Sequence, residues 1–341
     1  MSEIEVAQYP TTLNVPIAAR VPLSASACLN IAAWATLTVV AAVDYVWMQR
    51  AGFAVATGAI AQQISGLLIM AVSVLILRGI SRSSRYSQLA LRFHFREGCA
   101  LVDALAVMML FTFAALILQN LCVSLAPPVI DKELIALDAM VGFHWPDLYT
   151  WQTKHHFASV ALSKVYLSYT YQVVFTIIVL GITKRTDDLA DFVLLFMAAA
   201  VTVILISAPF PASNPMIHFG FSEPESPWSQ FYALREGEMT VFDLDRGQGL
   251  ISMPSLHAAD AVLFAYAVRH VRWVFPASAA LNIVMIYSAI PFGAHYLVDI
   301  FAGIMLAGLL IVLLRRWRGY VSQQSEQGRP NDKILASNIS R

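Results

Sequence analysis

The stretch LADFVLLFMAAAVTVILISA, residues 189–208, decides the fold class of this chain. It holds one charged residue, Asp191. An α-helix needs about 20 apolar residues to cross the hydrocarbon core of a bilayer, which is about 30 Å thick. The stretch has this length. The strands of a membrane β-barrel would instead show segments of about ten residues with alternating hydropathy. The stretch therefore predicts a transmembrane helix.

The composition of the whole chain agrees with a membrane protein. Of its 341 residues, 58% are hydrophobic and 13% charged, whereas an average soluble domain carries about 25% charged residues. Basic and acidic residues are balanced at 22 each, without the basic excess that nucleic-acid binding requires. We therefore expect an integral membrane protein with the bilayer, and not nucleic acid, as partner. The composition leaves the oligomeric state open.

Seven further apolar stretches have the length and low charge of the first. We predict an all-α, polytopic membrane helix bundle of about eight spans, of which the sixth is short. The eight expected spans cover residues 26–47, 58–77, 101–123, 159–182, 189–208, 256–268, 275–291 and 296–314. The three cysteines Cys28, Cys99 and Cys122 lie in apolar surroundings without zinc or redox spacing, and we expect them to pack.

Basic residues follow every second expected span, which predicts the orientation. They are Arg78, Arg82, Arg85, Arg92 and Arg96 after the second span, Lys184 and Arg185 after the fourth, Arg269 and Arg272 after the sixth, and Arg315, Arg316 and Arg318 after the eighth. With eight spans, all four groups lie on one side of the membrane, and short loops rich in Lys and Arg are cytoplasmic. The opposite face receives two long loops, residues 124–158 and 209–255.

The second long loop enters the sixth span through GLISMPSLHAA, residues 249–259. Pro254-Ser255 before an apolar run is typical of a helix start, with Ser255 as N-cap. The free N–H groups and the dipole of a helix N-terminus suit a phosphate, and His257 would lie in that first turn. A Pro-Ser cap alone is more often plain helix initiation.

The short loop before the eighth span carries GAHYLVD, residues 293–299. His295 and Asp299 are four residues apart, so the carboxylate can orient the imidazole and leave its other nitrogen free as nucleophile or base. An ionisable residue inside a membrane span is a functional candidate by default. The pair alone could equally be a structural hydrogen bond or half of a metal site.

Topology places both motifs at the non-cytoplasmic ends of their spans, where they can meet in one pocket. A histidine paired with a carboxylate and a second histidine beside a helix start supply a nucleophile and a general acid. This equipment fits phosphoryl transfer through a phosphohistidine, with no metal or cofactor required.

At these residues the sequence resembles the type-2 phosphatidic acid phosphatase superfamily, through Pro-Ser-x-His at residues 254–257 and His-x-x-x-Asp at residues 295–299. The context, including LDAMVGFHW at residues 137–145, is closest to its inositol phosphorylceramide synthase-like branch of inositolphosphotransferases. The resemblance implies that His257 protonates the leaving group, that His295 attacks phosphorus, and that Asp299 orients His295. It also implies a phosphatidic acid phosphatase-like core over about residues 138–314.

Two departures from the superfamily concern phosphate binding. The serine and arginine that usually precede the third-motif histidine correspond to Ser288 and Ala289, and the Lys/Arg-Pro motif is also missing. We expect Arg235 to hold the phosphate together with Ser255, since Arg suits bidentate phosphate contacts. Arg246 and Lys154 are weaker candidates. A salt bridge from Arg235 to Glu236 or Glu238 is almost as good an interpretation.

Several other polar residues receive structural interpretations. Asp260 either orients His257 or is a satisfied helix-start carboxylate, which we prefer. An interfacial aromatic belt, which could also shape a lipid entry, is expected for Trp145, Trp151 and Trp228. Packing or a place in this belt is expected for Tyr166, Tyr169 and Tyr171, although one of them could face the pocket. The loop histidines His144, His155 and His156 lack a metal-ligand pattern. Asp103 is expected to pair with the flank at residues 92–96.

Together these features predict a membrane enzyme that cleaves or transfers a phosphate ester on a lipid phosphate or phospholipid headgroup at the non-cytoplasmic face. We divide the chain into a cytoplasmic N-terminal segment (1–25), a membrane catalytic domain (26–318) and a flexible cytoplasmic tail (319–341). The expected location is a bacterial inner membrane, with the site facing the periplasm or exterior. The alternatives are a proton-coupled transporter or lipid flippase, and a non-catalytic membrane scaffold.

Overall fold

The structure is a computed structural model that describes residues 24–82, 95–221, 230–244 and 250–327. These residues form helices and one pair of short strands. The elements are α1 (Ala25–Ala51), β1 (Ala54–Val55), α2 (Thr57–Arg82), α4 (Phe95–Val123), α5 (Asp131–Met140), α6 (Trp145–Lys154), α7 (His156–Leu167), α8 (Tyr169–Ile182), α9 (Thr186–Ser207), α10 (Pro215–His218), α11 (Gln230–Arg235), β2 (Val241–Phe242), α12 (Leu256–Ala267), α13 (Phe275–Phe292) and α14 (Leu297–Gln327). The predicted all-α polytopic bundle is confirmed.

All eight expected spans are helical, but not all are long enough to cross a bilayer alone. Within the described residues, the helices α1, α4, α9, α13 and α14 have the length and hydropathy of a span. The pair α7 and α8, bent by 48° at the break between them, makes a sixth if it counts as one span. The apolar part of α2 and the 12-residue α12 are shorter. At 1.5 Å per residue, α12 rises about 18 Å, which is less than the hydrocarbon core.

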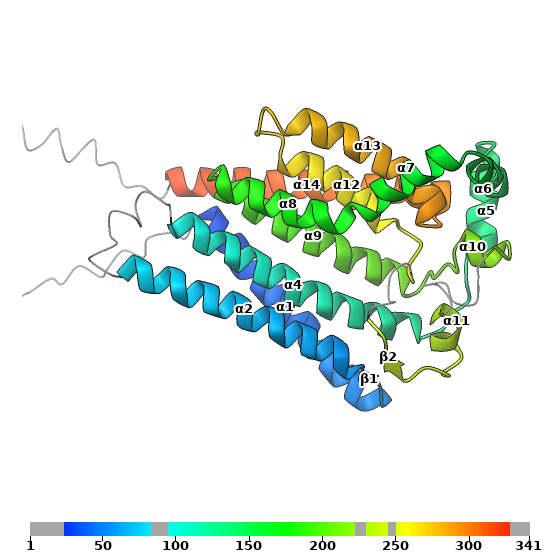
Figure 1. Cartoon of the computed structure of the whole chain (residues 1–341), viewed down its shortest axis with the longest axis horizontal. Helices are drawn as coiled ribbons and strands as arrows, with labels where there is room; N and C mark the ends of the chain where they lie inside the picture. Colours follow the sequence, from blue (N-terminus) through cyan, green and yellow to red (C-terminus); the bar gives the residue numbers. More distant parts are fainter. Residues whose placement is uncertain (1–23, 83–94, 222–229, 245–249, 328–341) are drawn as a thin grey trace, which may run out of the picture.

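The long helices lie lengthwise beside one another, and the short ones gather at one end of the bundle (Figure 1). We call this the loop end, defined by α5, α6, α10 and α11. The N-termini of α12 and α14 also point to it. The opposite end, which holds the α8–α9 and α12–α13 turns and the C-terminus of α14, is the arginine end. The fold therefore places the segments with basic residues at one end of the bundle and the two long loops at the other, as the charge pattern predicts.

Ion pairs join three of the basic segments at the arginine end. Asp188 pairs with Arg185 at 3.2 Å and with Arg269 at 2.9 Å, and Asp191 pairs with Arg318 at 2.6 Å. The turns after α8 and α12 therefore meet the C-terminal part of α14, which agrees with their predicted common side. Among the other basic residues of the pattern, Arg85 and Arg92 lie outside the described residues.

The two ends of the chain are described only in part. Helix α14 continues to Gln327, so the first residues of the predicted tail extend this helix. Residues 328–341 and 1–23 lie outside the described part, and so do Arg246, Trp228 and Gly249 of the second long loop. The three cysteines are free thiols, and Cys122 is buried in the main core cluster.

A two-stranded parallel ladder ties the second long loop to the α1–α2 turn. Strands β1 and β2 pair Ala54 with Val241 and Val55 with Phe242. The ring of Phe242 stacks on Phe53 at 5.0 Å. Buried apolar residues of α4 and α11 pack on the same cluster. The N-terminal hairpin therefore holds the loop segment that carries Arg235.

Candidate functional site

The first site residue begins helix α12. Ser255 has extended backbone angles, and its hydroxyl oxygen accepts the N–H of Ala258 at 3.3 Å, so the predicted N-cap is confirmed. The residue has no exposed surface. Its backbone N–H donates to the carbonyl of Asp299 at 3.0 Å. The start of α12 is thereby bonded directly to the first turn of α14.

His295 and Asp299 form the predicted pair. His295 precedes α14 and Asp299 lies in its first turn, and both are buried. The imidazole Nδ1 is 3.5 Å from Oδ2 of Asp299, an ion-pair contact that is too long for a strong hydrogen bond. The shorter bonds to that oxygen come from the hydroxyl of Ser252 at 2.6 Å and the N–H of Tyr296 at 3.0 Å. These two donors fix the carboxylate that faces His295.

The structure brings the two histidines together. The ring centroids of His257 and His295 are 6.4 Å apart. Reacting atoms lie about 3–3.5 Å apart before a bond forms. A phosphate group between the two rings would therefore be within reach of both. Both rings therefore border one site, at the meeting point of the N-termini of α12 and α14.

His257 lies against two of the tyrosine rings that the sequence analysis considered. The ring centroids of Tyr166, in α7, and of Tyr169, in α8, are each 4.5 Å from the His257 ring. The hydroxyl of Tyr169 donates to Oδ2 of Asp260 at 2.6 Å. Tyr171 is 77% exposed and takes no part. Tyr166 and Tyr169 also pack against hydrophobic clusters, so the packing interpretation holds for both. The pocket-facing alternative, made for one tyrosine, applies to these two rings as well.

Two carboxylates of α5 hold the turn that carries His295. Asp138 accepts the N–H groups of Leu297 and Val298, each at 2.9 Å, and so caps α14 from another helix. Burial raises the pKa of Asp138, the two N–H donors oppose that shift, and the nearby negative charge of Asp299 adds to it. Asp131 accepts the hydroxyl of Tyr296 at 2.7 Å. A capping residue about 160 positions away leaves no local signal, which is why sequence reasoning missed this role.

Two glycines allow the elements of the site to approach. A Cβ on Gly293 would lie 2.6 Å from the carbonyl of Ala289 and 2.7 Å from Cδ2 of His295. A Cβ on Gly303 would collide with the carbonyl oxygen of Ser255. The close packing of α14 on α12 therefore requires a residue without a side chain at position 303.

Arg235 ends α11 and contacts a loop of the same face. Its Nη2 donates to the carbonyl of Pro127, and its guanidinium lies over the ring of Phe231 at 5.1 Å. The buried Nη1 has no partner within the described part of the chain. Burial lowers the pKa of Arg235, and the charges of Tyr232 and Asp131 oppose that shift. No described contact joins Arg235 to His257 or His295.

The alternative salt bridge of Arg235 is absent from the structure. Among the described ion pairs, neither Glu236 nor Glu238 bonds to it. Lys154 is exposed at the end of α6. Ala289, which stands where the superfamily carries an arginine, is buried in the cluster around Trp145.

The aromatic residues of the first long loop divide into two kinds. Trp145 is only 2% exposed and donates to the carbonyl of Ile290 at 3.2 Å. Its predicted place in an interfacial belt is therefore wrong, because the ring packs in the core beside the site. Trp151 is 41% exposed and stacks on His155 at 4.6 Å, as a belt residue can.

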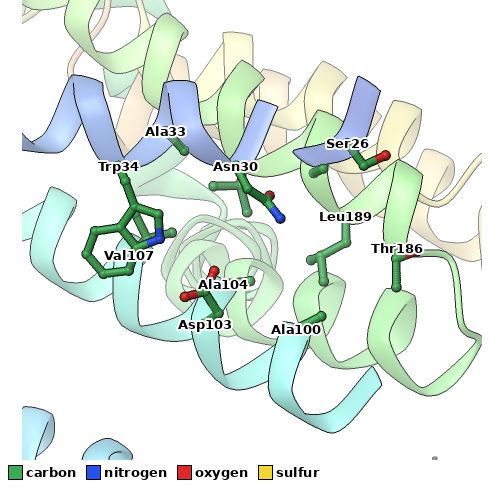
Figure 2. A pocket seen from close by; sticks show the side chains of 12 residues that line it. Ser26, Asn30, Ala33, Trp34, Ala100, Asp103, Ala104, Val107, Thr186 and Leu189 are labelled. Atoms are coloured by element: carbon green, nitrogen blue, oxygen red, sulfur yellow. The ribbon is translucent and has the colours of Figure 1, made fainter. Parts of the chain in front are cut away.

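A cavity away from the two histidines lies among α1, α4 and α9. It has a volume of about 60 Å³ between the first turns of α1, α4 and α9, at the arginine end. Figure 2 shows Asp103 of α4 on the same cavity as Asn30 and Trp34 of α1. The side chains of the predicted partner flank lie outside the described residues. No group of three or more His, Cys, Asp or Glu within the described residues could hold a metal ion.

The comparisons with known proteins agree with this arrangement at the level of the family. The PAP2 superfamily matches residues 132–313, more than half of the chain and the part that contains α12 and α14. No curated protein and no solved structure matches the chain. Members of the superfamily are phosphatases and phosphotransferases. This helical membrane protein belongs to the PAP2 superfamily.

Proposed function

We propose that the chain is a membrane enzyme that cleaves or transfers the phosphate ester of a lipid phosphate or a phospholipid headgroup through a phosphohistidine. The observation that carries the proposal is the 6.4 Å separation of His257 and His295. One ring faces a carboxylate, and the other lies in the first turn of a helix. Family membership supports the same class of chemistry.

In the first half-reaction, His295 is the nucleophile. Asp299 faces Nδ1, so Nε2 is the nitrogen that can attack phosphorus. The P–N bond forms while the bond from phosphorus to the leaving oxygen breaks. His257 gives its proton to that oxygen. A lipid alcohol leaves, and the phosphoryl group stays on His295.

In the second half-reaction, an acceptor hydroxyl attacks the phosphohistidine. His257, now neutral, takes the proton of the acceptor as the P–N bond breaks. With water as the acceptor the enzyme is a phosphatase, and with a lipid hydroxyl, such as that of ceramide or diacylglycerol, it is a headgroup transferase. The absence of an arginine at Ala289 supports the synthase-like branch of the superfamily.

The phosphate needs positive partners during both steps. The N-terminus of α12 supplies N–H groups and its dipole, and Ser255 sets the geometry of that terminus. We assign Arg235 as the additional cation, because it ends α11 at the same end of the bundle and keeps a buried N–H group unpaired within the described residues. The chemistry needs no metal or other cofactor.

The orientation follows from the arginine end. Basic loops stay in the cytoplasm, so the histidines at the opposite end face outward. In a bacterial inner membrane this face is the periplasm or exterior. The catalytic domain would span residues 26–318, with residues 1–25 and 319–341 in the cytoplasm.

The test is hydrolysis of phosphatidic acid by the purified protein in detergent with a chelator present. We expect His295→Ala and His257→Ala to lose at least about 100-fold in rate, the usual range for general acid–base groups. His155→Ala is the matched control, since that histidine is exposed and outside the site. Full activity of His295→Ala would overturn the mechanism. An inactive wild type with proton-coupled uptake that survives His257→Ala would favour a transporter.

A further inference from the structure

Helix α12 carries a buried carboxylate that the reaction above does not use. Asp260 has no exposed surface and lies three residues after His257, on the same face of the helix. An uncompensated charge at such a place is costly, and ionisable groups inside a membrane bundle are usually functional. Its Oδ1 has no partner in the described residues. Packing alone would not require a carboxylate here.

The carboxylate reaches His257 through a tyrosine. Tyr169 donates its hydroxyl to Oδ2 of Asp260 at 2.6 Å, and its ring lies 4.5 Å from the His257 ring. Tyr166 covers His257 as well, at 4.5 Å and with an interplanar angle of 22°. The two rings thus restrict the imidazole, and Asp260 holds one of them in place.

This arrangement suits a histidine that must act as an acid. The face of an aromatic ring attracts a cation by its quadrupole, and the attraction strengthens when water is excluded. This attraction stabilises the protonated form that gives its proton to a leaving oxygen.

We propose that Tyr169 and Asp260 are positioning residues that hold His257 in place for protonation of the leaving group. The proposal rests on the proposed function and deepens it. Neither residue touches phosphorus. They serve the departure of a poor leaving group and not the attack by His295.

The distinguishing experiment compares two leaving groups. One substrate is a long-chain alkyl phosphate, whose alkoxide needs a proton to leave. The other is a nitrophenyl phosphate with the same alkyl chain on its ring, whose phenolate leaves without one. Tyr169→Phe and Asp260→Asn should lower kcat about 10–100-fold on the alkyl phosphate, somewhat less than loss of the acid itself. On the aryl phosphate they should lower it less than about 3-fold, with KM unchanged on both.

Two further variants show what loss of the general acid and loss of the nucleophile do to the two activities. His257→Ala should show the same leaving-group pattern more strongly, and His295→Ala should lose both activities. Tyr171→Phe is the matched control, because it removes the same atom from an exposed tyrosine of the same helix. If Asp260→Asn does not fold, Tyr169→Phe still decides, since it deletes a single oxygen.

Two results would overturn the proposal alone. They are equal losses on both substrates, which a structural role would cause, and wild-type rates in both variants while the wild type is active. A wild type that hydrolyses neither substrate would overturn the proposed function, and this inference with it.

Discussion

Asp299 shows how single contacts determine the chemistry of His295. Its Oδ2 accepts two hydrogen bonds, from Ser252 and from the N–H of Tyr296, and faces Nδ1 of the imidazole at 3.5 Å. The hydroxyl and the N–H bind the same carboxylate oxygen that faces the imidazole. Catalytic hydrogen bonds are often long in the free enzyme and shorten with substrate bound.

We predict that Asp299→Asn lowers kcat by at least about 100-fold, because the amide no longer favours the imidazolium that builds up as the bond to phosphorus forms. Steady-state rates on the alkyl phosphate measure this. Asp147→Asn, at an exposed carboxylate of α6 that pairs with His144, should keep the wild-type rate. A variant Asp299→Asn with more than half of the activity would contradict the role.

We also predict that Gly303→Ala destabilises the protein by about 1–3 kcal/mol, because the new methyl group meets the carbonyl of Ser255 and forces α14 away from α12. The thermal unfolding midpoint in detergent measures this. Gly308→Ala is the control from the same helix, since a Cβ there meets nothing within 4 Å. Equal midpoints for the two variants would show that the contact is not required.

At the scale of elements, α5 and α14 act as one unit. The carboxylate of Asp138 satisfies two N–H groups at the start of α14, a task that an N-cap residue usually performs from within its own chain segment. Asp131 holds Tyr296 in the same turn. The position of His295 therefore depends on a helix more than 150 residues earlier.

Asp138→Ala should leave both N–H groups unpaired and cost about 1–3 kcal/mol of stability. We expect it to lower kcat as well, because the turn with His295 loses its anchor. Chemical denaturation and steady-state rates check the two effects. Glu133→Gln, on the exposed side of the same helix, should change neither. Unchanged stability of Asp138→Ala would mean that water replaces the cap.

At the scale of the whole molecule, the two ends of the helix bundle differ in their charged residues. The arginine end is held by Asp188 and Asp191, and the histidines lie at the other end with the short helices (Figure 1). Since short loops rich in Lys and Arg are usually cytoplasmic, this distribution of charge predicts that substrate enters from the non-cytoplasmic side.

Cysteine labelling in intact cells tests this orientation. In a chain whose own cysteines are replaced, Met140→Cys at the loop end should react with a membrane-impermeant maleimide added outside. Trp273→Cys at the arginine end should react only after permeabilisation. The two positions are 81% and 85% exposed, so access to the side chain is matched. The reverse pattern would place the histidines in the cytoplasm.

Sequence reasoning was most successful where a property is local. Hydropathy over some 20 residues predicts a helix in a bilayer, and all eight stretches are helical, although α12 is too short to span alone. The spacing of four between His295 and Asp299 predicts their contact. The interpretation of Trp145 failed because hydropathy does not tell an interfacial indole from a buried one.

Three features follow from the amino-acid sequence alone because they depend on residues close together in the chain. They are the helical class, the clustering of basic residues after every second expected span, and the pairing of His295 with Asp299. Two other features became visible in the folded chain: Tyr169 bonds to Asp260 beside His257, and Asp138 caps α14. Those contacts join residues 91 and 159 positions apart. Residues so far apart in the chain come into contact only when their helices pack, and a local sequence pattern does not show which helices will pack.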